Sequence, residues 1–144
     1  MNQQIEQTID ESPLFKHLSN KERTELADAS RLQTYASRHK IIEEDSSVDA
    51  LYIVLQGRVR VWTDGPKGEV ELKQMGPGAY FGEVSLMSGN RATATVQVTK
   101  GPAKVVAIDR DKLLELVETD EKIRKMLQGV TLARAKDTIG KVFK

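Results

Sequence analysis

The stretch Tyr80–Val98, YFGEVSLMSGNRATATVQV, decides the fold of this chain. An aromatic pair and Gly82-Glu83 lead into one short apolar turn, and a second turn at residues 88–90 leads into an alternating strand. The first N–H groups of a short helix lack partners within the helix, and the aligned peptide dipoles there favour an anion. A glycine at that point lets a ligand approach the backbone closely. The stretch therefore predicts an anion cradle, for phosphate, between two strands of a β-rich domain.

The alternation after the second turn assigns the following side chains to two faces, because successive side chains of a strand point to opposite sides. One face is small and apolar, and we expect it to point inward. The inward set is Ala92, Ala94, Val96 and Val98, and the outward set is Arg91, Thr93, Thr95 and Gln97. A regular strand therefore directs Arg91 away from the cradle, unless a bulge or a tightened loop at residues 88–90 turns it back.

The sequence around this stretch predicts many short strands separated by turns, which is typical of a β-sandwich or barrel. Gln56-Gly57 and Gly101-Pro102 are expected to interrupt the apolar runs beside them, and residues 64–68 form a strong turn signal. The expected strands lie near Tyr35, at Ile41-Ile42, and over Leu51–Leu55, Arg58–Thr63, Glu69–Lys73 and Lys104–Ile108.

Helical patterns are expected at both ends of the chain. Residues 1–12 are polar and predict a loosely held helix or tail, and Pro13–Leu18 predicts one helical turn that begins with proline. Ser19 and Glu22 have the spacing of a capping box, which predicts a helix over roughly residues 21–30. Asp109 starts the C-terminal helices, and Asp120 caps a longer helix whose apolar residues recur at helical spacing.

The motif FGEVSLMSGNRATATV resembles the phosphate-binding cassette of cyclic nucleotide-binding domains. The family has F-G-E, a short apolar helix, a loop, then Arg, a small residue, Ala, Ser or Thr, and Val. The resemblance covers most of the chain, since Leu51–Gly57 is similar to the family's central hairpin and Gly76-Pro77-Gly78 and the helical tail also fit. It implies an antiparallel β-roll, or jelly-roll barrel, with an N-terminal helical segment, a short cassette helix and C-terminal helices.

This chain departs from the family at one position of the cassette. The spacing from Phe81 to Val96 matches without a gap, yet it places Ala92 where the phosphate-pairing arginine belongs, and Arg91 comes one residue early. A hydrogen bond to a charged group contributes about 1.5–3 kcal/mol. At about 1.4 kcal/mol per power of ten, losing it weakens binding by roughly one to two powers of ten. We therefore expect the cradle to bind its ligand more weakly than a relative with arginine.

The resemblance implies a ligand site formed by Gly82, Glu83, Val84, Ser85, Arg91, Ala92 and Thr93. Glu83 would accept the ribose 2′-hydroxyl; the alternative is that it only offsets the dipole of a helix start. Gly82 and the backbones of Val84 and Ser85 would donate to the phosphate. Some relatives place a threonine at the position of Thr93 to contact phosphate or guanine, and an exposed strand residue is the alternative there. A solvated turn residue is the competing interpretation for Arg91.

Composition excludes several other classes of protein. With 144 residues, a net charge of +1 and no cysteine, the chain has the size of one domain and carries no disulfide or Cys-based metal site. No apolar run is long enough to span a membrane, no secretory signal is present, and the cytoplasm is the default location. His17 and His39 have no metal-like spacing, which disfavours a metal-dependent cupin enzyme. The acidic residues 43–45 are most simply solvated in a turn.

We therefore expect one cyclic nucleotide-binding-like domain over residues 1–144, with a helical lead-in (1–34), a β-barrel (35–108) and C-terminal helices (109–144). The expected function is a stand-alone sensor or regulatory domain for signal transduction that binds cAMP or cGMP and is not an enzyme, with no metal and no cofactor. The alternative is a protein-interaction or dimerisation module that keeps the fold without the ligand. Expected partners are an effector protein and a homodimer through the C-terminal helix, with no DNA and no membrane.

Overall fold

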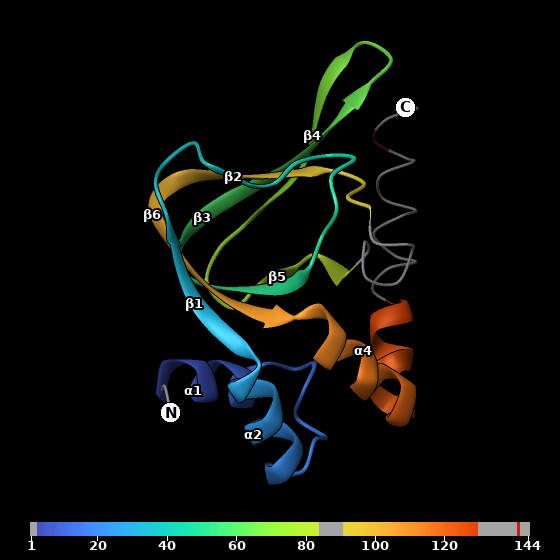
Figure 1. The fold of residues 1–144 in the computed structure, drawn as a ribbon. Helices are drawn as coiled ribbons and strands as arrows, with labels where there is room; N and C mark the ends of the chain where they lie inside the picture. The colour runs from blue at the N-terminus through green and yellow to red at the C-terminus, as the bar shows by residue number, and fades with distance from the viewer. Residues whose placement is uncertain (1–2, 84–90, 130–140, 142–144) are drawn as a thin grey trace.

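Two long antiparallel strands, β3 and β6, carry the fold, and the other strands attach to them (Figure 1). The computed structural model describes residues 3–83, 91–129 and 141. In the sheet the order is β1-β6-β3-β4, while β2 also pairs with β6 and β5 also pairs with β3. The strands are β1 Ser30–Tyr35, β2 Lys40–Ile42, β3 Ala50–Gly65, β4 Gly68–Met75, β5 Tyr80–Phe81 and β6 Thr95–Asp109.

The prediction that Gln56-Gly57 and Gly101-Pro102 separate short strands was wrong, because both long strands continue through these positions. The pairing of β3 with β6 shifts register around Gln56, and Gly57 has a φ of +86°. A Cβ on Gly57 would lie 2.8 Å from Pro102 O and 2.8 Å from Ala103 Cα. The two glycine-containing segments therefore face each other, and the paired strands bend together there instead of ending.

The continuous apolar run at the start of β3 has a structural reason: the strand is buried on both faces. Leu51 and Ile53 belong to a core shared with the helices, whereas Ala50, Tyr52 and Val54 belong to a second core, called the concave core because the strands curl around it (Figure 1). Alternate residues of one strand thus hold two cores together, as expected for a strand covered on both sides.

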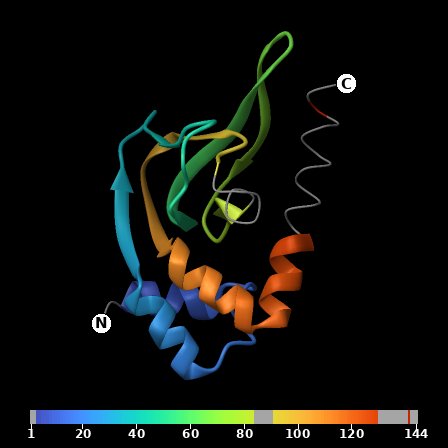
Figure 2. The same ribbon diagram turned by 45° about the vertical axis from the view of Figure 1, so that its right-hand side comes forward.

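The helices pack together at one end of the sheet, as two views show (Figures 1 and 2). α1 packs against α2, and Leu113 of α4 joins the same core as Leu26 of α2. Residues 1–12 were predicted to form a loosely held helix or tail; a helix forms, but it is not loosely held, because Ile5 and Ile9 of α1 are buried in that core. Two apolar residues four positions apart give one buried stripe. The labelled helices are α1 Gln3–Glu11, α2 Asn20–Asp28 and α4 Arg110–Thr119, followed by a helix over residues 121–129.

The predicted helix caps are confirmed. Ser19 and Glu22 form a full capping box, and Asp109 Oδ2 accepts a hydrogen bond from Lys112 N at 3.2 Å. Asp120 Oδ1 accepts from Lys122 N at 2.9 Å, at the start of the helix over residues 121–129. Residues 13–17 form consecutive turns in place of the predicted helical turn, with Phe15 N donating to Ser12 O. Side-chain acceptors at helix starts satisfy N–H groups that the helix leaves over.

The predicted fold class is confirmed: an antiparallel sheet dominates and helices flank it. β1 begins at Ser30, earlier than the boundary at residue 35, because residues 30–35 pair along β6 despite their mostly polar side chains. The predicted cassette helix and the end of the C-terminal helix lie outside the described residues. In the part of the chain that the structure describes, no helix is both long and apolar enough to cross a membrane.

Candidate functional site

The entrance to the cassette is fixed on β3 by backbone pairing and by an aromatic stack. β5 pairs through Phe81 with Tyr52 and through Tyr80 with Ile53. The rings of Phe81 and Tyr52 stack with centroids 5.1 Å apart and planes 14° apart, and both side chains are buried. Stacked aromatic pairs of this kind add to the stabilisation from buried area. These contacts fix the position of Gly82, the next residue, relative to β3.

Gly82 occupies a conformation and a space that favour glycine. Its φ is +100°, and a Cβ there would lie 2.9 Å from the carbonyl oxygen of Ala50. Left-handed backbone and close approach to another backbone both disfavour a side chain. The sequence predicted a tight turn or a close ligand approach at Gly82, and this geometry is compatible with both.

Glu83 follows directly and is 0% exposed. Glutamate is almost never fully buried unless it is paired, because removing a carboxylate from water is costly. An acidic residue that only balances a surface helix start would remain in water. The position of Glu83 therefore suits a carboxylate that serves an interior site. Val84 and Ser85, the other predicted donors at this end, lie outside the described residues.

The three remaining predicted site residues, Arg91, Ala92 and Thr93, lie at the exit of the cassette, where the chain leaves it, and they differ in burial. Ala92 is buried, whereas Arg91 and Thr93 are exposed. Nε of Arg91 donates a hydrogen bond to the carbonyl oxygen of Asp45 at 3.2 Å. Thr95, assigned to the outward face, is buried instead, and its hydroxyl accepts a hydrogen bond from Glu44 N at 3.0 Å. The structure brings Ala92 to the concave core and leaves Arg91 beside the loop at residues 43–47.

The loop over residues 43–47 lies against this exit. Asp45 has a φ of +69°, a left-handed conformation that aspartate tolerates. Asp45 N donates to Ala92 O and Ala92 N donates to Ser46 O, each at 2.8 Å. Ser47 forms an isolated β-bridge with Arg91. These contacts join the loop to the segment that leaves the cassette.

Glu44 is a residue that the sequence did not identify. It was interpreted as a solvated turn residue, but it is half-buried, and its Oε1 accepts hydrogen bonds from Thr63 Oγ1 and from Asp64 N, the latter at 3.2 Å. Thr63 lies 19 residues away and Thr95 lies 51 residues away. No local signal marks such contacts, because the register of the folded sheet creates them.

The family comparison agrees with this geometry. The pattern of the cyclic nucleotide-binding domain family matches residues 32–120, which include both ends of the cassette. This chain belongs to the cyclic nucleotide-binding domain family. The domain is 36% identical over 104 residues to the cAMP-dependent protein kinase type II regulatory subunit of Drosophila melanogaster, over 72% of this chain and 28% of that protein.

Two further relatives support the placement of this cyclic nucleotide-binding domain. It is 31% identical to cGMP-dependent protein kinase, isozyme 1, of Drosophila melanogaster, over 73% of this chain and 14% of that protein. The regulatory domain of Toxoplasma gondii PKA, solved as a co-crystal with cAMP, has a TM-score of 0.71 and 26% identity, over 78% of this chain and 42% of that chain. The domain therefore spans only a minor part of the curated relatives it matches.

The concave core of this cyclic nucleotide-binding domain holds a tyrosine behind Gly82. Tyr52 is 6% exposed, and a Cβ on Gly82 would lie 3.7 Å from Tyr52 Cδ2. Burial raises the pKa of Tyr52 to about 12, with smaller contributions in the same direction from Tyr35 and Asp49. The phenol is therefore neutral throughout the physiological pH range.

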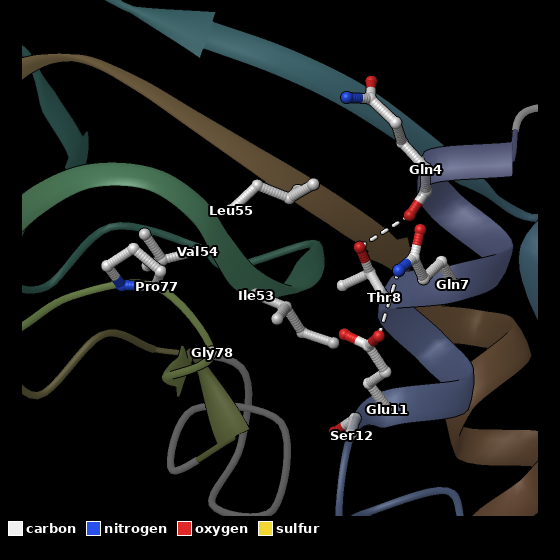
Figure 3. A pocket seen from close by; sticks show the side chains of 10 residues that line it. All are labelled: Gln4, Gln7, Thr8, Glu11, Ser12, Ile53, Val54, Leu55, Pro77 and Gly78. Atoms are coloured by element: carbon white, nitrogen blue, oxygen red, sulfur yellow. Dashed lines mark hydrogen bonds between the residues drawn. The ribbon is translucent and has the colours of Figure 1, made fainter.

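A hollow lies away from the cassette, between α1 and β3 (Figure 3). It has a volume of about 300 Å³, and side chains of α1 face β3 across it. Ile53 and Leu55 supply apolar lining, and Gln7 Nε2 donates to Glu11 Oε1 at 3.0 Å on the helical side. Pro77 and Gly78, from the Gly76-Pro77-Gly78 segment that resembles the family, line this hollow. The described cassette residues do not contribute to its lining.

Proposed function

We propose that this domain is a sensor that binds a purine cyclic monophosphate, cAMP or cGMP, without chemical conversion. The observation that carries the proposal is the fully buried Glu83 directly after the left-handed Gly82. A buried carboxylate at that point can accept the ribose 2′-hydroxyl, and helix-start N–H groups beyond it can hold the phosphate. Relatives named for cAMP and cGMP dependence support the choice of ligand class.

The affinity in this proposal is lower than that of a domain with arginine at position 92. Ala92 lies in the concave core, so a side chain at this position points toward the interior of the sheet. Arg91 is exposed and donates to the Asp45 carbonyl. The phosphate would then depend on backbone donors without a guanidinium, at the cost of the charged hydrogen bonds that arginine would add.

The output in this proposal passes through the C-terminal helices. β6, which begins just after the cassette, runs directly into α4. Arg110 N donates to Asp49 O at 2.9 Å, and Asp109 N donates to Ala29 O at 3.0 Å. A ligand shifts such an element only by binding its alternative positions with different affinity. An effector protein, a homodimer through the last helix and a cytoplasmic location belong to this proposal. The family match favours it over a module without ligand.

A thermal-shift series tests the ligand class. A ligand at ten times its Kd adds about 1.4 kcal/mol to folding stability, and each kcal/mol raises the Tm of a domain this size by about 3 °C. Millimolar cAMP or cGMP should therefore raise the Tm by a few degrees. 5′-AMP, with an open phosphate, and adenosine, with none, are the controls. No shift with either cyclic nucleotide, or an equal shift with 5′-AMP, would overturn the proposal.

A further inference from the structure

Glu44 joins three separate segments of the chain at the exit of the cassette. Its carboxylate accepts from Thr63 Oγ1 and Asp64 N at the end of β3, and its backbone N donates to Thr95 Oγ1 at the start of β6. Thr63 and Thr95 are both buried, with 7% and 3% exposure. Buried hydroxyl groups need hydrogen-bond partners, because leaving them unsatisfied costs free energy. Glu44 supplies a partner to both.

Hydrogen bonds of the residues next to Glu44 connect it to the end of the cassette. Asp45 and Ser46, the next two residues, exchange the two 2.8 Å backbone hydrogen bonds with Ala92. Arg91 Nε donates a further hydrogen bond to Asp45 O. Glu43, in contrast, is exposed, and the donors Thr63 Oγ1 and Asp64 N both bond to Glu44. Of the two adjacent glutamates, Glu44 is therefore the one that is hydrogen-bonded to strands of the sheet.

We propose that Glu44 is a positioning residue for the cyclic nucleotide site, and this inference rests on the proposed function. Its carboxylate fixes the loop over residues 43–47 on the end of β3, and the loop in turn fixes the backbone of Ala92. The donors to the carboxylate are a hydroxyl and a backbone N–H, both neutral. An uncharged amide oxygen in the same place can accept the same hydrogen bonds. Acceptor geometry, and not charge, is what this role requires.

Amide hydrogen exchange of the ligand-free protein, followed by NMR, tests the structural half of the inference. Glu44→Ala should speed exchange at Asp45, Asp64 and Ala92 by about tenfold or more, because local opening governs exchange at such sites. Amides of β6 that pair with β1 should keep their rates. Glu44→Gln and the charge-matched control Glu43→Ala should leave all these rates unchanged. Unchanged exchange in Glu44→Ala, equal acceleration in Glu43→Ala, or uniform acceleration across the sheet would each overturn the inference.

Titration of the same three variants with cAMP tests the functional half. Glu44→Ala should weaken binding by about tenfold, while Glu44→Gln and Glu43→Ala should stay near wild type. If the wild-type protein binds no cyclic nucleotide, the proposed function fails and the exchange experiment still decides whether Glu44 fixes Ala92. If Glu44→Ala exchanges faster at Ala92 but binds cAMP as the wild type does, the positioning role is wrong.

Discussion

Nε of Arg91 donates a hydrogen bond to the carbonyl oxygen of Asp45, 3.2 Å away, on the exposed surface beside the cassette. The adjacent residue, Ala92, is buried in the concave core. Neighbouring residues of an extended chain point to opposite sides, so a guanidinium at position 91 and one at position 92 reach different surroundings. Arginine at position 91 therefore contacts the loop over residues 43–47, whereas an arginine at position 92 would point toward the proposed ligand site.

Ala92→Arg should tighten cAMP binding by roughly ten- to a hundredfold, because it adds a charged hydrogen bond to the phosphate. Titration calorimetry measures the change, and a melting curve confirms that the variant folds. Thr99→Arg is the control, since it adds the same charge at an exposed position of β6 beyond the cassette motif. An equal gain in Thr99→Arg would show that net charge, and not the direction of the side chain, sets the affinity.

Glu83 should be responsible for any preference for a ribose over a deoxyribose. The wild-type protein should bind cAMP about tenfold or more tightly than 2′-deoxy-cAMP, because the carboxylate accepts the 2′-hydroxyl. Glu83→Ala should remove that preference while both ligands bind more weakly. Competition binding with the two nucleotides gives the four affinities of a double-mutant cycle. If Glu83→Ala still prefers cAMP over 2′-deoxy-cAMP, the ribose hydroxyl does not bind to Glu83.

Gly82→Ala should lower the free energy of unfolding by about 1–3 kcal/mol, because alanine is strained at positive φ and meets the Ala50 carbonyl. Gly129→Ala is the matched control: it lies in the helix over residues 121–129, and a Cβ there meets nothing within 4 Å. This second change should raise stability by about 1 kcal/mol. Urea unfolding of both variants measures the difference, and equal effects of the two substitutions would argue against a special conformation at Gly82.

The pKa of Tyr52, raised to about 12 by burial, predicts a loss of stability in alkali. The unfolded chain releases this proton near pH 10 and the folded protein only near pH 12, so stability falls as the pH rises through that window and is intact below it. Tyr52→Phe should remove a pH-dependent loss on the order of 2 kcal/mol. Denaturant unfolding of both proteins between pH 9 and 12 measures it, and identical pH profiles would contradict the assignment.

Local patterns predicted much of this fold correctly. The capping box at Ser19 and Glu22, the turn between Gly65 and Gly68, and the helix start at Asp109 all depend on residues within a few positions of one another. Such signals are physical properties of the chain segment itself and appear in the sequence. The cassette motif likewise indicated the fold through an ordered series of residues.

The features that sequence reasoning missed depend on distant partners. Gly57 and Pro102 looked like separate breaks, but their close approach makes them one bend in paired strands. Thr95 was assigned outward by alternation, but it is buried beside Glu44, whose backbone N donates to the Thr95 hydroxyl across 51 residues. Alternation predicts the face of a side chain, but a covering loop decides whether that face reaches water.

Titration calorimetry of the wild-type protein with cAMP and cGMP tests the central claim most directly, with Arg91→Ala and Ala92→Arg measured beside it. The account predicts saturable one-site binding of a cyclic nucleotide that is weaker than in Ala92→Arg and does not depend on a contact between Arg91 and the phosphate. Folded wild-type protein that gives no binding heat at millimolar nucleotide, or tight binding that Arg91→Ala abolishes, would contradict it.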